Sequence, residues 1–105
     1  MDEVFKALAD ESRRKLLDEL RRENGQRLAD LCVRLDMTRQ AVSKHLKILE
    51  DANLIATLWR GREKLHYLNP VPLHEIYERW ISKFERQRVQ ALFDLKATLE
   101  NKKEK

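Results

Sequence analysis

One segment constrains the fold more than any other, because it joins two helical patterns through a very short turn. Apolar residues at helical spacing occupy positions 27–35, and a second such pattern at 39–51 follows Thr38, a good N-cap residue. Between the two patterns, Asp36 and Met37 break the period. A turn this short does not allow an antiparallel hairpin of helices, so the spacing predicts a helix-turn-helix.

The residues within this segment fit that geometry. Cys32 is small enough for the two helices to approach closely, and Asp36 tolerates left-handed dihedral angles in the turn better than most residues. The core between the helices is predicted to consist of Leu31, Leu35, Met37 and Val42. His45 falls at a position that is usually apolar in this motif, so we expect it to be partly buried.

Two shorter helices are predicted before this segment. Apolar residues recur at helical spacing between Val4 and Ala9, which indicates a short first helix. Asp10 can cap a second helix, and Gly25 suits the position just after its end.

A hairpin and one long helix are predicted after the segment. Residues 55–60 and 64–68 are rich in β-branched, aromatic and aliphatic side chains, and Gly61 lies in the basic turn between them. After Pro72, apolar residues continue towards Glu100 and predict a single helix. The order of four helices, a hairpin and a fifth helix is a mainly α fold with a small β-hairpin wing, a winged helix-turn-helix. We expect Trp59, Leu65 and Tyr67 to anchor the hairpin to the core.

Composition narrows the function classes only moderately. Lys and Arg number 22 against 18 acidic residues, and the net charge of +4 has the sign expected of a nucleic-acid-binding protein, although an ordinary basic soluble protein would share it. The single cysteine excludes an intramolecular disulfide. The acidic start of the chain does not resemble a signal peptide, and no apolar run approaches the roughly 20 residues of a membrane span. We therefore expect a cytoplasmic protein with no membrane partner.

The outward face of the second helix of the motif carries the predicted DNA-reading residues. Val42, Leu46 and Leu49 share the inward face, which leaves polar side chains on the other side. Gln can pair with adenine, Arg and Lys with guanine, and Ser with either a base or a phosphate. The predicted DNA-binding residues on this helix are Thr38, Arg39, Gln40, Ser43, Lys44 and Lys47, and those on the hairpin are Arg60, Arg62 and Lys64.

The last helix indicates dimerisation. Its apolar stripe is too long for a core this small to cover, and a second copy of the chain would bury it. The predicted interface residues are Val4, Phe5, Trp80, Phe84, Leu92, Leu95 and Leu99. Residues 1–100 would then form one domain that binds DNA and dimerises, followed by a charged, flexible tail at 101–105. A two-fold dimer suits a pseudo-palindromic DNA site.

Several runs resemble the ArsR/SmtB family of bacterial repressors over about residues 2–99. They are FKALAD from Phe5, SRRKLL from Ser12, TRQAVSKHLKILEDANLI from Thr38, and the hairpin end His66-Tyr67-Leu68. The resemblance implies a dimeric winged helix-turn-helix that blocks transcription by occupying an operator, often its own. It also implies that the recognition helix and wing contact DNA and that the first and last helices form the dimer.

The metal-sensing motifs of that family are incomplete here. The family's thiolate site resembles ELCVCDL, but Arg34 stands where the second cysteine would be, after Cys32 and Val33. Residues 81–100 contain no histidine, and His74 with Glu78 would supply only two ligands. We therefore predict no metal and no other cofactor, and leave open as an alternative a metal- or thiol-responsive repressor that uses Cys32.

Two other classes of protein, enzymes and winged helices that bind protein or RNA, fit the sequence less well. No catalytic triad, phosphate-binding glycine loop or concentrated acid pair is visible, so the sequence does not indicate an enzyme. A winged helix that binds a protein or RNA is the second alternative, and Gln40, Ser43 and Lys44 favour duplex DNA over it. The sequence identifies no effector, operator or regulated gene.

Overall fold

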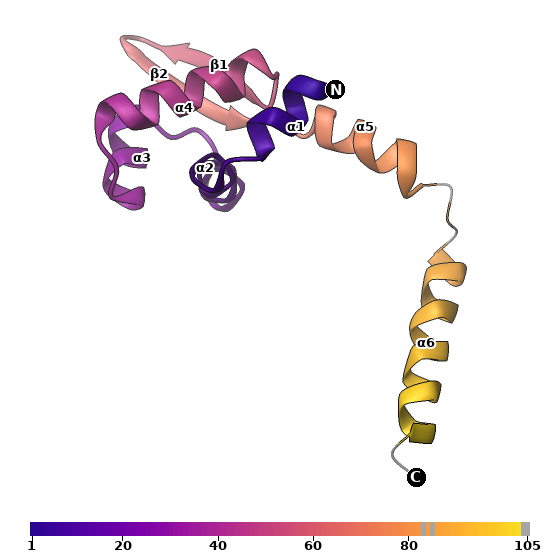
Figure 1. Cartoon of the computed structure of the whole chain (residues 1–105). Helices are drawn as coiled ribbons and strands as arrows, with labels where there is room; N and C mark the ends of the chain where they lie inside the picture. The colour runs from indigo at the N-terminus through magenta and orange to yellow at the C-terminus, as the bar shows by residue number, and fades with distance from the viewer. Residues whose placement is uncertain (83, 85, 104–105) are drawn as a thin grey trace. The chain divides into compact units, whose positions relative to one another are not determined.

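The computed structural model describes residues 1–82, 84 and 86–103, which form six helices and one hairpin (Figure 1). The elements are α1 (Asp2–Leu8), α2 (Glu11–Arg22), α3 (Leu28–Leu35), α4 (Arg39–Asp51), β1 (Ile55–Arg60), β2 (Glu63–Leu68), α5 (Val71–Trp80) and α6 (Arg86–Lys103). The chain divides into two units, Met1–Leu73 and His74–Lys105. The first unit has the predicted winged helix-turn-helix fold.

The second helix begins where the sequence predicts. The Asp10 carboxylate accepts hydrogen bonds from the backbone N–H of Ser12 at 2.8 Å and of Arg13 at 3.2 Å, which caps α2. These bonds, the one from Arg13 foremost, lower the pKa of Asp10 below its usual range. Beyond the helix, Gly25 has a φ of +80°, and a Cβ there would lie 3.1 Å from the Tyr67 hydroxyl oxygen.

The turn between α3 and α4 has the predicted chemistry. Asp36 takes the left-handed conformation, with φ 50° and ψ 51°, directly after α3. Thr38 then caps α4 by accepting a hydrogen bond from Ala41 N–H at 3.1 Å. In the interface of the two helices Leu31 and Val42 are fully buried, while Leu35 and Met37 are half-buried. The two helices of the motif therefore pack against each other through these residues.

The core lies where the first four helices meet the start of the hairpin. Burying one such leucine or valine contributes about 1.5–3 kcal/mol to folding. The buried apolar residues are Val4, Ala7, Leu16, Leu17, Leu20, Leu31, Val42, Leu46, Leu49, Ala52, Leu54 and Ile55.

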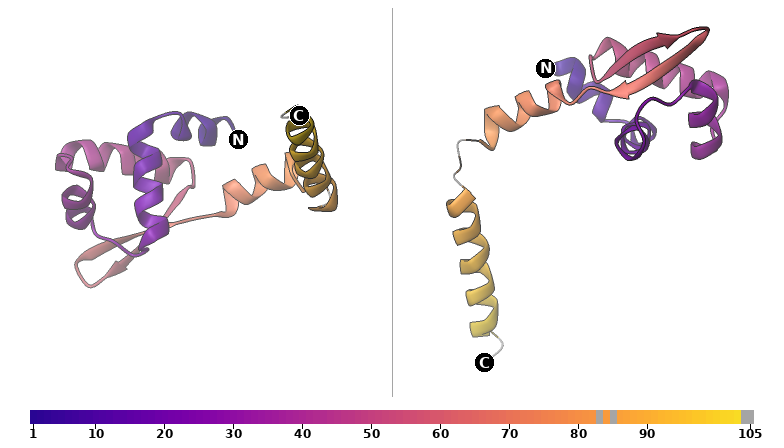
Figure 2. Two further views of the ribbon diagram at one scale, coloured as in Figure 1. Left: turned by 90° about the horizontal axis from the view of Figure 1, so that it is seen from below. Right: turned by 180° about the vertical axis from the view of Figure 1, so that it is seen from behind.

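The hairpin packs against α4, and its tip extends past the helices in the left view of Figure 2. Its antiparallel register runs from Ile55 opposite Leu68 to Arg60 opposite Glu63. A third segment adds to the edge of β2, because His66 N–H donates to the Gln26 carbonyl at 2.9 Å and Gly25 N–H donates to the His66 carbonyl at 2.8 Å. The base of the hairpin is therefore fixed to the loop after α2.

Only part of the predicted hairpin anchor is present. Leu65 and Tyr67 are half-buried, in agreement with the prediction. Trp59 is 65% exposed, so the expectation that it anchors the hairpin is wrong. Among the six residues of β1, Ile55 alone is buried, because the rest of the strand extends beyond the helices.

The single helix predicted from Pro72 to Glu100 is instead two helices. At the end of α5, Ser82 N–H donates to the Tyr77 carbonyl at 2.9 Å, and the Ser82 hydroxyl donates to the Glu78 carbonyl at 2.7 Å. These bonds satisfy the last carbonyls of α5 without a further helical turn. The sequence run 82–88 holds only one apolar residue, Phe84, so no apolar stripe favours helix there. The later helix, α6, continues to Lys103, into the segment predicted to be a tail.

Candidate nucleic-acid interface

The recognition helix α4 presents a polar face because its apolar residues are held in the core. Val42, Leu46 and Leu49 are buried, as their spacing predicts. The residues on the opposite face, all exposed, are Arg39, Gln40, Ser43, Lys44 and Lys47. Side chains that could reach base edges therefore lie along one side of a helix that the core supports rigidly.

The N-terminal end of α4 favours an anion. Its first turn contains no acidic residue, and its N-cap Thr38 is exposed. The unpaired backbone N–H groups and the helix dipole place partial positive charge there, and Arg39 adds a full charge. The Thr38 hydroxyl oxygen already accepts from Ala41, so Thr38 serves first as a cap.

The predicted basic residues differ in whether their side chains form ion pairs within the chain. With the described residues, the side chains of Arg39, Lys44, Arg60 and Arg62 form no hydrogen bond or ion pair. Lys47 lies 3.7 Å from the Asp51 carboxylate, and Lys64 lies 3.2 Å from the Glu50 carboxylate. The first four are therefore available to phosphates, whereas Lys64 connects β2 to α4.

A hollow of about 540 Å³ lies between α4 and the hairpin. Its lining residues are Arg27, Leu28, Ala29, Arg39, Ser43, Leu46, Lys47, Glu50, Trp59, Arg62, Glu63, Lys64 and His66. Five of them are Lys or Arg and two are Glu, so the hollow has a positive balance. Residues of α4 and of the hairpin that the sequence predicted to bind DNA therefore lie on one surface.

His66 is a residue of this region that the sequence analysis did not single out. It is 4% exposed, with Nδ1 2.9 Å from the Gln26 carbonyl oxygen and Nε2 3.9 Å from Glu50 Oε1. Since a carbonyl can only accept, Nδ1 carries the hydrogen. His66 therefore connects the hairpin to the loop before α3 and faces the recognition helix. The alternation of strand residues does not distinguish it from its neighbours, so the sequence held no clear signal.

His45 is partly buried, as predicted, and its Nδ1 lies 3.4 Å from the Arg13 guanidinium. Arg13 also donates to the Ala7 carbonyl at 2.7 Å. The contact joins α4 to α2 and the end of α1, which is a structural role.

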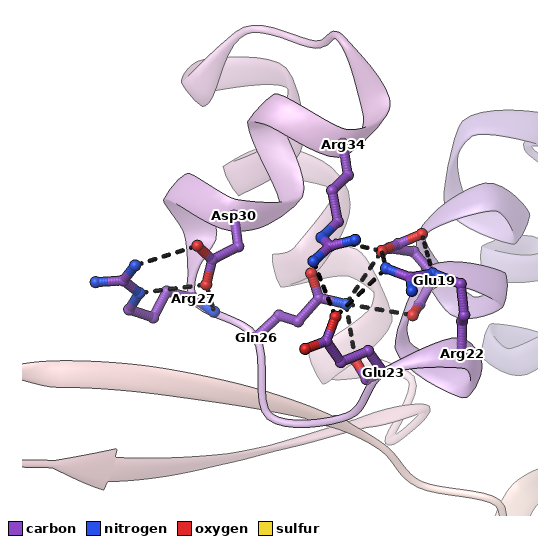
Figure 3. A network of polar contacts seen from close by, with 7 residues as sticks. All are labelled: Glu19, Arg22, Glu23, Gln26, Arg27, Asp30 and Arg34. Carbon is purple, nitrogen blue, oxygen red and sulfur yellow. Dashed lines mark hydrogen bonds and ion pairs between the residues drawn. The ribbon is translucent and has the colours of Figure 1, made fainter.

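A polar network connects α2 with α3 (Figure 3). Arg34 of α3 lies 3.4 Å from the Glu19 carboxylate and 2.9 Å from that of Glu23. Gln26 Nε2 donates to the Glu23 carbonyl at 2.7 Å. The hydrogen bond from Arg22, foremost among several contacts, lowers the pKa of Glu19.

The same network bears on the family's thiolate metal site. Arg34, at the position of the missing second cysteine, is held by two carboxylates, and Cys32 is half-buried rather than buried. Among the described residues, no three His, Cys, Asp or Glu side chains group closely enough to hold a metal ion. With an arginine in place of the second cysteine, Cys32 supplies a single thiol, which does not make the thiolate set that a soft metal requires.

At the start of α3, Arg27 connects the helix to the hairpin. Its guanidinium lies 3.1 Å from the Asp30 carboxylate and 2.9 Å from the Glu63 carboxylate at the start of β2. Asp30, with Glu63 second, raises the pKa of Arg27, and Arg27 lowers the pKa of Asp30. Arg27 and the Glu50–Lys64 pair together hold the hairpin against α3 and α4.

The predicted interface residues are mostly exposed. Val4 is 9% exposed and packs in the chain's own core, which leaves it little surface for a partner. The others are between 43% and 64% exposed: Phe5, Trp80, Phe84, Leu92, Leu95 and Leu99. Val89 and Phe93 extend the exposed apolar surface of α6. No helix in the described part of the chain is both long and apolar enough to cross a membrane.

Comparison with known proteins identifies the family. The profile described as a helix-turn-helix domain matches residues 8–57. The chain is 41% identical to an uncharacterised HTH-type transcriptional regulator of Bacillus subtilis strain 168, YuzN, over 76% of this chain and 94% of that protein. It is 31% identical to the arsenical resistance operon repressor of Escherichia coli K12, over 86% of this chain and 79% of the repressor.

A solved structure shows the same fold. The ArsR-like transcriptional regulator from Rhodococcus sp. RHA1 is 30% identical and superposes with a TM-score of 0.71, covering 96% of this chain and 86% of the other. The chain therefore belongs to the ArsR family of DNA-binding helix-turn-helix transcriptional regulators.

Proposed function

We propose that the protein is a homodimeric repressor that binds a pseudo-palindromic operator in double-stranded DNA. The observation that carries this proposal is the polar face of α4, where Gln40, Ser43 and Lys44 are exposed and unobstructed beside the basic hairpin. Relatives named as transcriptional repressors support repression as the outcome of binding. Occupying a promoter on chromosomal DNA would place the protein in the cytoplasm.

In this proposal α4 enters the major groove and the hairpin reaches the neighbouring groove. Gln40, Ser43 and Lys44 contact base edges, because they are exposed within the first two turns of α4, the part of a recognition helix that reaches the bases. Thr38 and Arg39 contact a phosphate at the helix N-terminus. The remaining basic residues that we assign to phosphate contacts are Lys47, Arg60, Arg62 and Lys64.

The exposed apolar residues support a dimer. Six predicted interface residues are more than two-fifths exposed, and such side chains lose contact with water when a second copy covers them. Two copies related by a two-fold axis present two recognition helices about 34–36 Å apart, one turn of DNA. We assign Phe5, Trp80, Phe84, Leu92, Leu95 and Leu99 to this interface.

Fluorescence anisotropy tests the proposal. The labelled DNA is the segment upstream of the coding region, compared with a scrambled duplex of equal length over a salt series. We expect tighter binding to the first duplex, and we expect the Gln40→Ala/Ser43→Ala variant to lose about 1–3 kcal/mol of discrimination for each base contact removed. The affinity of Lys44→Ala for the upstream duplex is compared with that of Lys15→Ala. Lys15 is an exposed lysine of α2 that pairs with Glu11 and serves as the matched control.

Two results would contradict the proposal. Equal affinity for both duplexes, unchanged in the double variant, would exclude sequence-specific reading of the upstream segment by α4 and would leave a distant operator or non-specific binding. The second result would come from a transcription reaction with purified components. Added protein should lower transcription from a promoter that overlaps the bound site. An increase would exclude repression by occupancy.

A further inference from the structure

Trp59 stands out on the hairpin because it is a large apolar side chain that the core does not bury. It is 65% exposed and, with the described residues, makes no aromatic or cation–π contact. In β1 it lies opposite Lys64, and it lines the hollow between the hairpin and α4. An indole in this position contributes little to folding, so its contribution can be to a partner that enters the hollow.

The charges around the hollow specify the chemistry of that partner. Arg39 of α4 lines one side and Arg62 of the hairpin turn lines the other, and both are unpaired with the described residues. The two acids in the lining are already engaged, Glu50 by Lys64 and Glu63 by Arg27. An anion that enters therefore meets two available guanidinium groups and no available carboxylate.

The position of the hollow identifies one anion. If α4 occupies the major groove and the hairpin the adjacent minor groove, as the proposed function requires, one sugar–phosphate strand separates the two elements. That strand must cross the surface between them, which is the hollow. Its phosphates are anionic and its deoxyribose rings present apolar C–H faces, and this combination matches two arginines around an indole.

We infer that the hollow holds one sugar–phosphate strand of the duplex, with the Trp59 indole packed on a deoxyribose and with Arg39 and Arg62 on the adjacent phosphates. Because every nucleotide carries the same sugar, Trp59 raises affinity without selecting a sequence. The inference rests on the proposed function and adds an aromatic contact to its list of binding residues.

Affinity measurements separate this contact from base reading. We expect Trp59→Ala to weaken binding about tenfold on both the upstream and the scrambled duplex, so their ratio stays constant. The slope of log Kd against log salt should not change, since no phosphate contact is lost. The matched control is Leu58→Ala. Leu58 directly precedes Trp59 on β1, is 58% exposed and does not line the hollow.

Intrinsic fluorescence gives a second, local readout. The chain has two tryptophans, so Trp59→Phe leaves Trp80 as the remaining indole. Adding duplex to the unsubstituted protein should change its emission and reduce quenching by acrylamide, and most of that response should be absent in Trp59→Phe. This comparison requires no loss of affinity, because phenylalanine retains an aromatic ring in the hollow.

The outcomes distinguish the inference from the function on which it rests. If labelled duplex binds while Trp59→Ala keeps full affinity and the emission response persists in Trp59→Phe, the aromatic contact is excluded and the DNA-binding function stands. If Trp59→Ala changes the preference between the two duplexes, packing on the sugar is excluded in favour of base reading. If no duplex binds even at low salt, both proposals fail.

Discussion

Arg62 and Lys64 lie two residues apart on the hairpin, yet their surroundings differ. Arg62 is unpaired with the described residues, whereas Lys64 lies 3.2 Å from Glu50 and opposite Trp59. A cation already paired with a carboxylate neutralises a phosphate less effectively, because binding DNA must first separate or share the pair. Position along the hairpin alone would rank the two residues as equivalent.

This difference leads to a prediction about the salt dependence of DNA binding. Each phosphate contact contributes about 0.9 to the slope of log Kd against log salt. We expect Arg62→Ala to reduce the slope by about this amount per protomer, and Lys64→Ala to reduce it by clearly less. Anisotropy titrations on one duplex at four salt concentrations measure both slopes. Equal reductions would show that the Glu50–Lys64 pair does not persist on DNA.

The sequence predicted which face of α4 is exposed, but not which of the basic side chains form ion pairs. Helical spacing was enough to separate buried Val42 from exposed Ser43, since burial follows directly from the period. It could not predict the exposure of Trp59 or the burial of His66, because both depend on how far a hairpin extends past the helices. That distance is set by contacts among segments far apart in the chain, such as His66 with Gln26.

At the scale of elements, the α3–α4 turn determines where the recognition helix points. Asp36 has φ 50°, a conformation that costs roughly 1–2 kcal/mol for most residues and more for β-branched ones. The turn also contains a backbone bond from Met37 N–H to the Cys32 carbonyl at 3.2 Å. Both features fix the path of the chain between the two helices.

We therefore predict different effects on stability for two substitutions of Asp36. Asp36→Val should lower the free energy of unfolding by about 1–2 kcal/mol, since a β-branched side chain strains the left-handed conformation. Asp36→Gly should leave it unchanged or raise it slightly, because glycine adopts this conformation without strain. Urea denaturation monitored by circular dichroism measures the free energy of unfolding of both variants. A destabilised glycine variant would show that the Asp36 side chain, and not its backbone, supports the turn.

The last predicted helix shows where periodicity stops being informative. Apolar residues before Trp80 and after Val89 fit helical spacing, so a single helix was the direct interpretation. The short polar run between them contributes few residues to the pattern, and a hydroxyl such as that of Ser82 competes for backbone carbonyls. Spacing therefore predicted helical conformation on both sides of this run, whereas the break depends on local hydrogen bonds that spacing does not reveal.

At the scale of the whole molecule, α6 has the composition of a helix that another surface covers. Its leucine and phenylalanine side chains, Leu92, Phe93, Leu95 and Leu99, are all at least half exposed in the single chain. An isolated helix of this length is marginally stable in water, because most helix stability in proteins comes from packing. A second copy that covers this face would supply that packing and would also double the net charge of +4 presented to DNA.

We predict that a charge within this face separates the protomers. Leu95→Glu should shift the protein from a dimer towards the 12.6 kDa monomer in sedimentation equilibrium, because dimerisation would then bury an unpaired carboxylate. Asn101→Glu is the control, since it adds the same charge to α6 at an exposed polar position. Because a dimer binds both half-sites together, Leu95→Glu should also weaken operator binding by at least tenfold. If Leu95→Glu remained dimeric with full affinity for DNA, the α6 face would not be the interface.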